Sequence, residues 1–232
     1  MIWPAITVMI ITYKRPIEIR KTIKALRDNI KYPGKIFWHI ADDSSGEDYI
    51  PKIKEDFPEL TIFSTTCDRG GWGKNFNTAF KQISTEFIFV CEDDYVAKGE
   101  VDIHTGIALM QLDPSVALVR YDGVAGHDMV LELKTRHWSG GRDGLFLHYA
   151  TIRQEETELY AYSNRPHLIH KHFHEHFGLY PEDKKLGETE ETFAHIVKAL
   201  ADEQYRLAIL DTGFPPAFDH IGHSYQLTEE DK

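Results

Sequence analysis

The chain has 232 residues, of which 42% are hydrophobic, so it is long enough to bury one substantial core. Its formal net charge of −11 argues against a broad electrostatic grip on nucleic acid or on an anionic membrane, and any polyanionic partner would have to be held locally. Two cysteines, Cys67 and Cys91, are too few for a disulfide framework, which favours a reducing, cytoplasmic compartment.

Strands and helices alternate through the first hundred residues. The opening MIWPAITVMIITYK is apolar but short and has neither a basic n-region nor a cleavage site, so we expect a first strand at residues 6–11 rather than a signal peptide or a membrane span. Pro16 and apolar residues at helical spacing predict a helix over residues 17–30. The same patterns predict strands at residues 35–41, 60–64 and 86–91, and helices at residues 49–57 and 74–83. This alternation predicts an α/β fold with a doubly wound, mainly parallel sheet.

The pattern is looser beyond residue 100. A helix is expected at residues 103–112 and a strand at 116–120, followed by an irregular stretch to residue 144 that we interpret as a substrate lid. Further predictions are strands at residues 145–153, 167–170 and 206–211 and a helix at 190–203. We expect a single domain over residues 1–232, with a nucleotide-sugar-binding half at 1–98 and a variable, acceptor-binding and catalytic-base half at 99–232.

The segment EFIFVCEDDY is the most informative part of the chain. Its apolar run reads as a buried strand, so Glu92, Asp93 and Asp94 lie at the rim of the sheet, where open α/β folds bind their ligands. Three adjacent carboxylates repel one another, and a hard cation such as Mg²⁺ or Mn²⁺ would offset that repulsion and bridge to substrate phosphates. A solvated acidic turn is the alternative.

Three further segments precede the acidic one: VMIITYKRP, ADDSSGED and GGWGKNFNTAF. In this order the four resemble the inverting glycosyltransferases of family 2, which have the GT-A fold and use nucleotide-diphosphate sugars. The resemblance implies that Thr12 and Tyr13 face the nucleobase and that Asp42 or Asp43 accepts hydrogen bonds from the base or ribose. Capping of the next helix is another role open to these aspartates.

The third segment offers a diphosphate site. Glycines let the backbone approach a phosphate, and Lys74 at a helix start supplies a cation. The resemblance implies that Lys74, and secondarily Asn77, contacts the donor. An ordinary helix N-terminus is the competing interpretation.

The acidic segment resembles the family's Asp-x-Asp (DxD) signature, with Glu92 in place of the usual first aspartate. On this resemblance Asp94 is the first metal ligand, and Glu92 and Asp93 lie at the ribose or beside the metal, with Glu92 a further candidate ligand. The later segment FDHIGHS is similar to the family's His-x-Gly segment, which implies that His220 completes the metal site, with His223 as the second candidate.

A candidate general base lies in LGETEETFAHIVKAL. Glu188, Glu190 and Glu191 open a predicted helix, where the helix dipole favours negative charge, and this is a sufficient structural reason for them. An acceptor hydroxyl must nevertheless lose its proton as it attacks, and the family places an acidic pair here for that purpose. The resemblance implies Glu191 as the first choice for the base and Glu190 as the second.

Histidines crowd into PHLIHKHFHEHFG. As a strand, this segment would present alternate residues on one face and could form a zinc site, although acceptor binding or local packing is the favoured interpretation. The histidines in question are His167, His170, His172, His174 and His176.

Together these features predict a metal-dependent, inverting transfer from a nucleotide-diphosphate sugar, with a UDP-sugar as the expected donor, to an acceptor hydroxyl. The acceptor would be a soluble glycan, a protein side chain or a small molecule. One alternative is a hydroxymethylated base in viral DNA, held by a local basic surface of residues Arg136, Arg142, Arg153 and Arg165. Another is a non-catalytic nucleotide-sugar-binding domain. A nucleotidyltransferase is disfavoured because TYKRP lacks a Gly-rich phosphate loop.

Overall fold

The computed structural model describes residues 3–66, 68–121, 131–138, 145–152, 162–182, 184–185, 187–200, 206–210 and 218–222. Within these residues the strands are β1 (Ile6–Thr12), β2 (Ile36–Asp42), β3 (Ile62–Thr65), β4 (Phe87–Glu92), β5 (Tyr95–Ala97), β6 (Val116–Arg120), β7 (Leu131–Trp138), β8 (Leu145–Ile152), β9 (His167–His170), β10 (Arg206–Leu210) and β11 (Phe218–His220). The helices are α1 (Glu18–Asn29), α2 (Tyr49–Asp56), α3 (Gly71–Gln82), α4 (Ile103–Leu112), α5 (His172–Phe177) and α6 (Glu188–Leu200).

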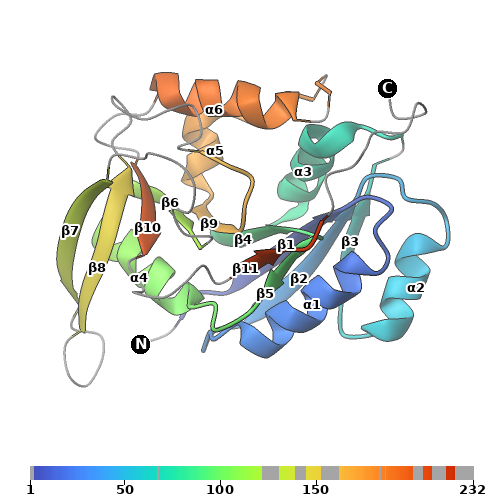
Figure 1. The fold of residues 1–232 in the computed structure, drawn as a ribbon, viewed down its shortest axis with the longest axis horizontal. Helices are drawn as coiled ribbons and strands as arrows, with labels where there is room; N and C mark the ends of the chain where they lie inside the picture. Colours follow the sequence, from blue (N-terminus) through green and yellow to red (C-terminus); the bar gives the residue numbers. More distant parts are fainter. Residues whose placement is uncertain are drawn as a thin grey trace.

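One mostly parallel sheet organises the molecule (Figure 1). Its strand order is β3-β2-β1-β4-β9-β6-β10-β8-β7, and β11 pairs with β5 in a separate two-stranded ribbon. The pairings give β8 and β9 one direction and the other strands of the sheet the opposite direction. The predicted α/β class with a doubly wound, mainly parallel sheet is therefore confirmed.

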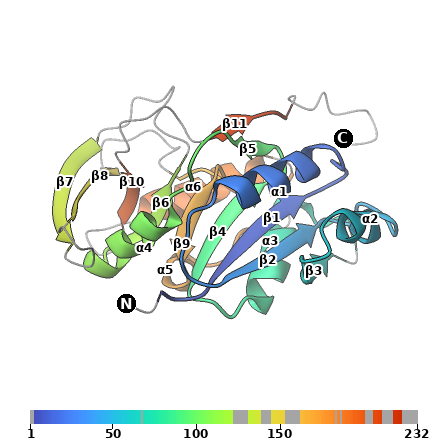
Figure 2. The same cartoon turned by 90° about the horizontal axis from the view of Figure 1, so that it is seen from below.

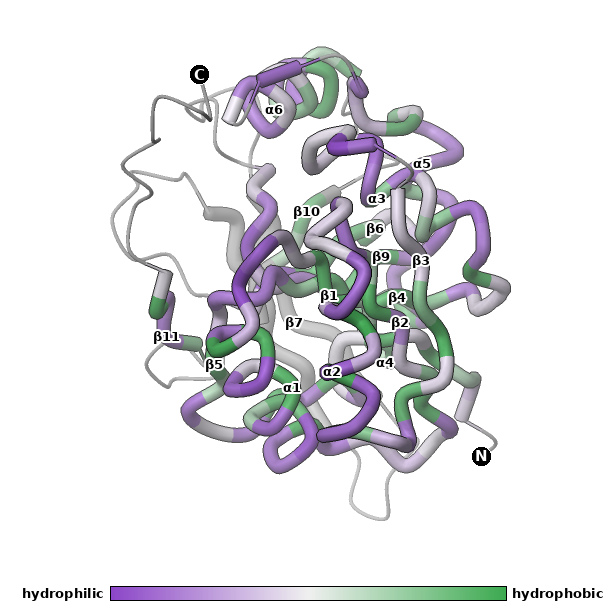
Figure 3. Tube along the Cα trace, turned by 90° about the vertical axis from the view of Figure 1, so that its right-hand side faces the viewer, coloured by the Kyte–Doolittle hydropathy of each residue, from purple (hydrophilic) through white to green (hydrophobic). Residues whose placement is uncertain are grey.

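Helices cover both faces of the sheet, and the alternation of side chains along β1 explains why. Ile6, Val8 and Ile10 point into a core that includes residues of α1 and α4, whereas Met9 and Ile11 point into a second core with α3, α5 and α6. The sheet is thus buried on both sides, with α1 and α4 in front when it is seen from below (Figure 2). Hydrophobic residues accordingly concentrate along the central strands (Figure 3).

Strand β9 is the main departure from a simple parallel order. It inserts between β4 and β6 and runs antiparallel to both, so that His167 at its start pairs with Val90 near the end of β4. The beginning of an antiparallel strand lies at the same edge as the ends of its parallel neighbours. The segment that precedes β9 is therefore brought to the edge where β4 ends.

Most predicted elements are confirmed to within a few residues, including β6, α4 and β9 at the predicted positions. Four elements were not predicted: the short strands β5 and β11, the helix α5, and β7, which replaces part of the expected irregular lid. The rest of the proposed lid, including Gly140 and Gly141, lies outside the described residues. No helix in the described part of the chain combines the length and apolar character needed to cross a bilayer.

Candidate active site

The carboxyl ends of β1, β2 and β4 meet at one edge of the sheet. Thr12 pairs with Asp42 and Ile11 pairs with Glu92, which fixes the ends of the three strands side by side. A hydrogen bond links the loops after β1 and β2: the backbone N–H of Lys14 donates to Ser45 Oγ at 2.7 Å. Lys14 and Ser44 have positive φ angles of 52° and 64°. Residues other than glycine seldom adopt this left-handed backbone conformation, and those that do cluster at functional sites.

Asp93 is held by the strand edge itself. Its Oδ2 accepts from Thr12 Oγ1 at 2.7 Å and from the N–H of Tyr13 at 3.3 Å, and its Oδ1 accepts from Arg15 at 3.3 Å. Because Thr12 donates to Asp93, the Tyr49 hydroxyl, 2.5 Å from Thr12 Oγ1, donates to Thr12. Burial raises the pKa of Asp93 to about 7 despite these donors.

This network gives structural roles to two residues. Thr12 is only 2% exposed and its hydroxyl donates to Asp93, so it supports the acidic strand end; a contact with the nucleobase stays a prediction. The Asp93 carboxylate likewise accepts hydrogen bonds from Thr12, Tyr13 and Arg15 and so stabilises the loop after β1. Tyr13 is partly buried, and the Arg69 guanidinium lies 4.7 Å from the centre of its ring.

Asp94 has a different environment. Its Oδ2 contacts Arg15 and lies 3.1 Å from His220 Nε2, whereas its buried Oδ1 has no hydrogen-bond partner in the described part of the protein. Gly222 lies against the same carboxylate, and a Cβ at that position would collide with Asp94. Ile221 also donates its N–H to the Asp94 carbonyl at 2.8 Å. The His-x-Gly segment is therefore fitted closely to Asp94.

The β5–β11 ribbon explains how His220 reaches this position. His220 pairs with Tyr95 across the ribbon, and the two rings stack with centroids 4.8 Å apart. The expectation that His220 lies beside Asp94 agrees with this geometry. His223, the second candidate, lies outside the described residues.

A divalent cation is compatible with Asp94 and His220, although the described side chains form no group of three His, Cys, Asp or Glu arranged to hold a metal. A buried carboxylate oxygen without a partner normally requires an explanation, and Asp94 Oδ1 is such an atom. Mg²⁺-type sites often use one or two protein ligands together with substrate phosphates and water. The donor set fits a cation that binds together with a diphosphate.

Asp43 has a structural role. Its carboxylate accepts from Thr66 Oγ1 at 2.8 Å and from the N–H groups of Gly70 and Gly71, both at 2.9 Å. It thereby ties β2 to the start of α3. Asp42 instead accepts from the N–H of Ser45 at 3.1 Å, and burial raises its pKa. Asp42 also accepts from the Ser45 hydroxyl, so its described donors come from one residue of its own turn, whereas those of Asp43 come from three residues.

Replacing Asp43 with Ala should destabilise the protein by about 3 kcal/mol, because three donors lose a charged acceptor. Asp43→Asn, which keeps one acceptor oxygen, should lose less. Urea unfolding of the two variants and the wild type would measure this. Unchanged stability of Asp43→Ala combined with lost nucleotide binding would contradict the structural role.

Lys74 and Asn77 both lie on α3, but they differ in how many hydrogen bonds and ion pairs they already form within the described protein. Lys74 lies in the first turn, is partly buried and forms no ion pair with any residue that the structure describes. Asn77 is buried, donates to the Tyr180 carbonyl and to Glu182 Oε1, both at 2.9 Å, and accepts from the Tyr180 N–H at 3.2 Å. Asn77 thus anchors the segment after α5, and its contact with the donor stays a prediction.

Glu190 and Glu191 lie on different sides of α6. Glu190 points into a cavity of about 360 Å³, and its Oε1 accepts from Ser163 Oγ at 2.9 Å and from the N–H of Asn164 at 2.8 Å. Glu191 is exposed and is not among the described residues that line the cavity. Of the two candidates for the base, Glu190 is the one that lines the described cavity.

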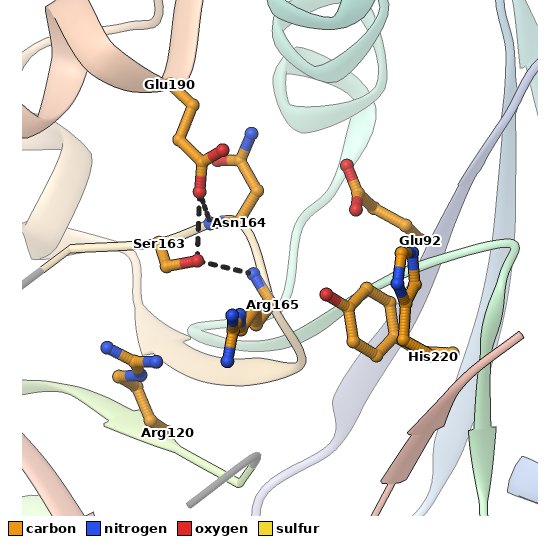
Figure 4. Close-up of a pocket in the computed structure, with 8 residues that line it drawn as sticks. Glu92, Arg120, Ser163, Asn164, Arg165, Glu190 and His220 are labelled. Atoms are coloured by element: carbon orange, nitrogen blue, oxygen red, sulfur yellow. Dashed lines mark hydrogen bonds between the residues drawn. The ribbon is translucent and has the colours of Figure 1, made fainter. Parts of the chain in front are cut away.

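The same cavity is bordered by Glu190 and by Glu92 at the end of β4 (Figure 4). Glu92 and His220 lie on the side opposite Glu190. Burial, together with the nearby carboxylates of Asp94, Glu190 and Asp93, raises the pKa of Glu92 well above its ordinary value. A cation entering beside Glu92 would reverse that effect. The cavity is lined by Glu92, Tyr95, Arg120, Ser163, Asn164, Arg165, Glu190 and His220.

The histidine cluster is not a strand and does not form a metal site among the described residues. Only His167 and His170 lie on β9, because α5 begins at His172. His174 is buried among Phe76, Phe80 and other rings, and burial lowers its pKa to about 3. His176 Nε2 lies 3.3 Å from the Leu200 carbonyl. The zinc interpretation therefore lacks support among the described residues, although the rings of His170 and His172 lie close together, with centroids 4.2 Å apart.

Sequence reasoning missed several residues of the site: Arg15, Arg120, Ser163 and Asn164. Arg120 was detectable, because it ends the apolar strand VALVR just as the acidic cluster ends β4. Ser163 and Asn164 lie in the segment AYSNRPHLIHK, which was expected to bind the acceptor or to pack locally, although neither residue was singled out. The antiparallel insertion of β9 brings them to the edge.

The family can now be assigned. The sequence model described as glycosyl transferase family 2 matches residues 7–178, well over half of the chain. The chain belongs to glycosyl transferase family 2. The match includes Asp42 at the end of β2, Lys74 in α3 and Asp94 after β4, and it stops before α6. A comparison with curated protein sequences found no significant match.

Solved structures with the fold of this family 2 chain include S. aureus TarS 1-349, with a TM-score of 0.64 and 17% identity over 90% of this chain. TarS 1-349 in complex with UDP-GlcNAc gives a TM-score of 0.65 and 16% identity over 98% of this chain. The mannosyltransferase PcManGT from Pyrobaculum calidifontis, in complex with GDP-Man and Mn²⁺, gives a TM-score of 0.55 and 16% identity over 90% of this chain. The matches cover 58%, 63% and 59% of those chains. At these identities they show that the fold is shared.

Proposed function

We propose that this chain transfers a sugar from a nucleotide-diphosphate sugar to an acceptor hydroxyl, with inversion at the anomeric carbon and with the help of a divalent cation. The observation that carries the proposal is a single cavity that holds Glu190 on one side and Glu92 with His220 on the other, beside Asp94. These groups supply what inverting transfer requires: a base for the acceptor and a site for the charged leaving group.

The donor would lie along the edge formed by β1, β2 and α3. Tyr13 and Asp42 would contact the nucleoside, and the Lys74 ammonium would meet the diphosphate as a fixed positive charge. Family membership supports a nucleotide-sugar donor, and the complexes of TarS with UDP and UDP-GlcNAc and of PcManGT with GDP-Man are consistent with it. We favour a UDP-sugar.

Asp94 and His220 would hold the cation, with Glu92 as a further oxygen ligand. Mn²⁺ or Mg²⁺ bound there would neutralise negative charge that develops on the diphosphate as the glycosidic bond breaks. The unpartnered Oδ1 of Asp94 supports this assignment, as does the Mn²⁺ of the PcManGT complex.

Glu190 would be the general base. Both hydrogen bonds from Ser163 and Asn164 go to Oε1, which orients the carboxylate and leaves Oε2 to accept the proton of the acceptor hydroxyl. The deprotonated oxygen attacks the anomeric carbon from the face opposite the diphosphate, the bond to the diphosphate breaks, and the configuration inverts. Ser163 and Asn164 are positioning residues in this scheme.

The acceptor is proposed only as a hydroxyl-bearing molecule: a soluble glycan, a protein side chain or a small molecule. The cavity walls are polar and charged, with Ser163, Asn164, Arg120 and Arg165 on the side of Glu190, which suits a hydroxyl-rich ligand. Of the arginines considered for a nucleic-acid acceptor, Arg165 lines this cavity, and the side chains of the others lie outside the described residues.

A panel of nucleotide-diphosphate sugars tests the proposal. Thermal unfolding would be followed with each sugar, with and without Mn²⁺, and one donor is expected to raise the melting temperature only when Mn²⁺ is present. The corresponding nucleoside monophosphate is the matched control, because it lacks the second phosphate for the cation to bridge. A panel without any stabilising donor would contradict the proposed function.

A further inference from the structure

Arg15 occupies the acidic strand end at the position where a cation is expected. Its guanidinium donates to Asp94 Oδ2 and, at 3.3 Å, to Asp93 Oδ1. The side chains of Asp93 and Asp94 are each 5% exposed, and that of Arg15 is 21% exposed. Two nearly buried carboxylates therefore share one positive charge that reaches the solvent.

Arg15 and the two aspartates lie on different parts of the fold. It lies in the connection between β1 and α1, outside both elements, whereas Asp93 and Asp94 are fixed by β4 and by the backbone of the following ribbon. Asp93 keeps the donors Thr12 and Tyr13 if the guanidinium leaves. Asp94 keeps only His220 among its described side-chain partners. Asp94 therefore depends on a cation much more than Asp93 does.

A divalent cation on Asp94 and the Arg15 guanidinium compete for the same carboxylate. Carboxylate ligands approach such cations at about 2.0–2.6 Å, which would leave the guanidinium only a few ångströms from the ion. Like charges at that separation repel strongly in a partly buried site. The two cations cannot both be bound to Asp94 without a large loss of affinity.

We propose that Arg15 is an internal counter-cation that holds Asp94 in the donor-free protein and is displaced when the divalent cation enters with the diphosphate. The inference rests on the proposed function, because it takes Asp94 as a metal ligand. The displaced guanidinium then has the donor phosphates as partners, which it can bind through two parallel N–H groups. Arg15 thus makes the cation bind weakly alone and tightly with the donor.

The test compares Mn²⁺ affinity with and without a nucleoside diphosphate, by the electron paramagnetic resonance signal of free Mn²⁺ at pH 8. Arg15→Gln removes the competing charge, so it should bind Mn²⁺ alone about tenfold more tightly than the wild type. The nucleoside diphosphate should then strengthen Mn²⁺ binding less than it does in the wild type, since the coupling is reciprocal. Damage to the fold would not raise metal affinity.

Two variants complete the experiment. Arg27 lies on α1 and forms an exposed ion pair with Glu59. Arg27→Gln removes the same charge at that position, so this variant should bind Mn²⁺ as the wild type does. Arg15→Lys keeps the positive charge but lacks the planar guanidinium that binds a phosphate through two N–H groups. It should therefore still bind Mn²⁺ alone weakly, and nucleoside diphosphate should strengthen that binding less than in the wild type. This variant also tests the proposal if Arg15→Gln does not fold.

The outcomes separate the two proposals. In the first outcome, the wild type binds Mn²⁺ together with nucleoside diphosphate, but Arg15→Gln binds Mn²⁺ alone no more tightly than the wild type. This result overturns the role of Arg15 and leaves the proposed function intact. No uptake by any variant, with or without nucleoside diphosphate, overturns the metal-dependent site itself and the inference with it.

Discussion

Glu190→Gln should lower turnover at least about 100-fold while the affinity for the nucleotide sugar stays within a factor of two. A positioned general base contributes about 10²–10⁴-fold, and the amide cannot take the acceptor proton. The amide oxygen can still accept from Ser163 and Asn164, so the side chain should keep its place. Release of nucleoside diphosphate measures turnover, and a titration with the donor alone measures binding.

Glu191→Gln is the matched control, one residue along the same helix. It removes an identical charge from an exposed position, so turnover should change by less than about twofold. A large loss in Glu191→Gln with a normal rate in Glu190→Gln would transfer the base to Glu191 and would mean that α6 turns when the acceptor binds.

Asp94→Asn should abolish the Mn²⁺-dependent part of donor binding. At a ligand concentration of about 100 times Kd, binding stabilises a folded protein by about 2.7 kcal/mol, and this contribution should disappear. Without Mn²⁺, the donor should raise the melting temperature of neither the variant nor the wild type. Thermal unfolding with and without Mn²⁺ gives both comparisons, and Asp56→Asn on α2, which pairs with Arg20 at the surface, controls for loss of a negative charge.

Gly222→Ala perturbs the same carboxylate without changing any charge. The added methyl group would collide with Asp94, whereas Ala at Gly99 would meet no atom within 4 Å. Gly222→Ala should therefore lose most of the Mn²⁺-dependent stabilisation, and Gly99→Ala should retain it. Normal Mn²⁺ dependence in Gly222→Ala would show that the position of Asp94 is not critical.

The sequence predicted the sheet edge well because two simple rules govern it. Apolar runs identify strands that are buried on both faces, and the residues that follow parallel strands share one edge. Asp42, Glu92 and Asp94 were placed at this edge in this way, and β2 and β4 end within one residue of their predicted ends. His220 came from the family resemblance, since its three-residue strand has no pattern of its own.

The assignment of roles was less predictable, because a polar side chain at the edge can serve either the ligand or the fold. Thr12, Asp43 and Asn77 are committed to internal hydrogen bonds that join segments distant in the chain. No local pattern distinguishes these residues from Asp42 or Lys74. Their donors and acceptors are known only when the loops have been placed in three dimensions.

The choice between Glu190 and Glu191 was within reach of the sequence. Residues three, four and seven apart share a face of a helix, and Glu190 stands at these spacings from the buried Phe193, Ala194 and Val197. Glu191 shares its side with the exposed His195 and Lys198. The apolar stripe of α6 therefore indicates that Glu190 turns toward the protein and Glu191 toward solvent.

The antiparallel insertion of β9 places two sides of the cavity on neighbouring strands. The anchors of Glu190 immediately precede β9, and Glu92 ends the neighbouring strand β4. Adjacent strands lie about 4.8 Å apart, a spacing fixed by backbone hydrogen bonds. The ladder between β4 and β9 thus keeps the anchors of Glu190 next to the strand that ends in Glu92. Changes in the loops around the cavity can therefore alter its walls without separating these two sides.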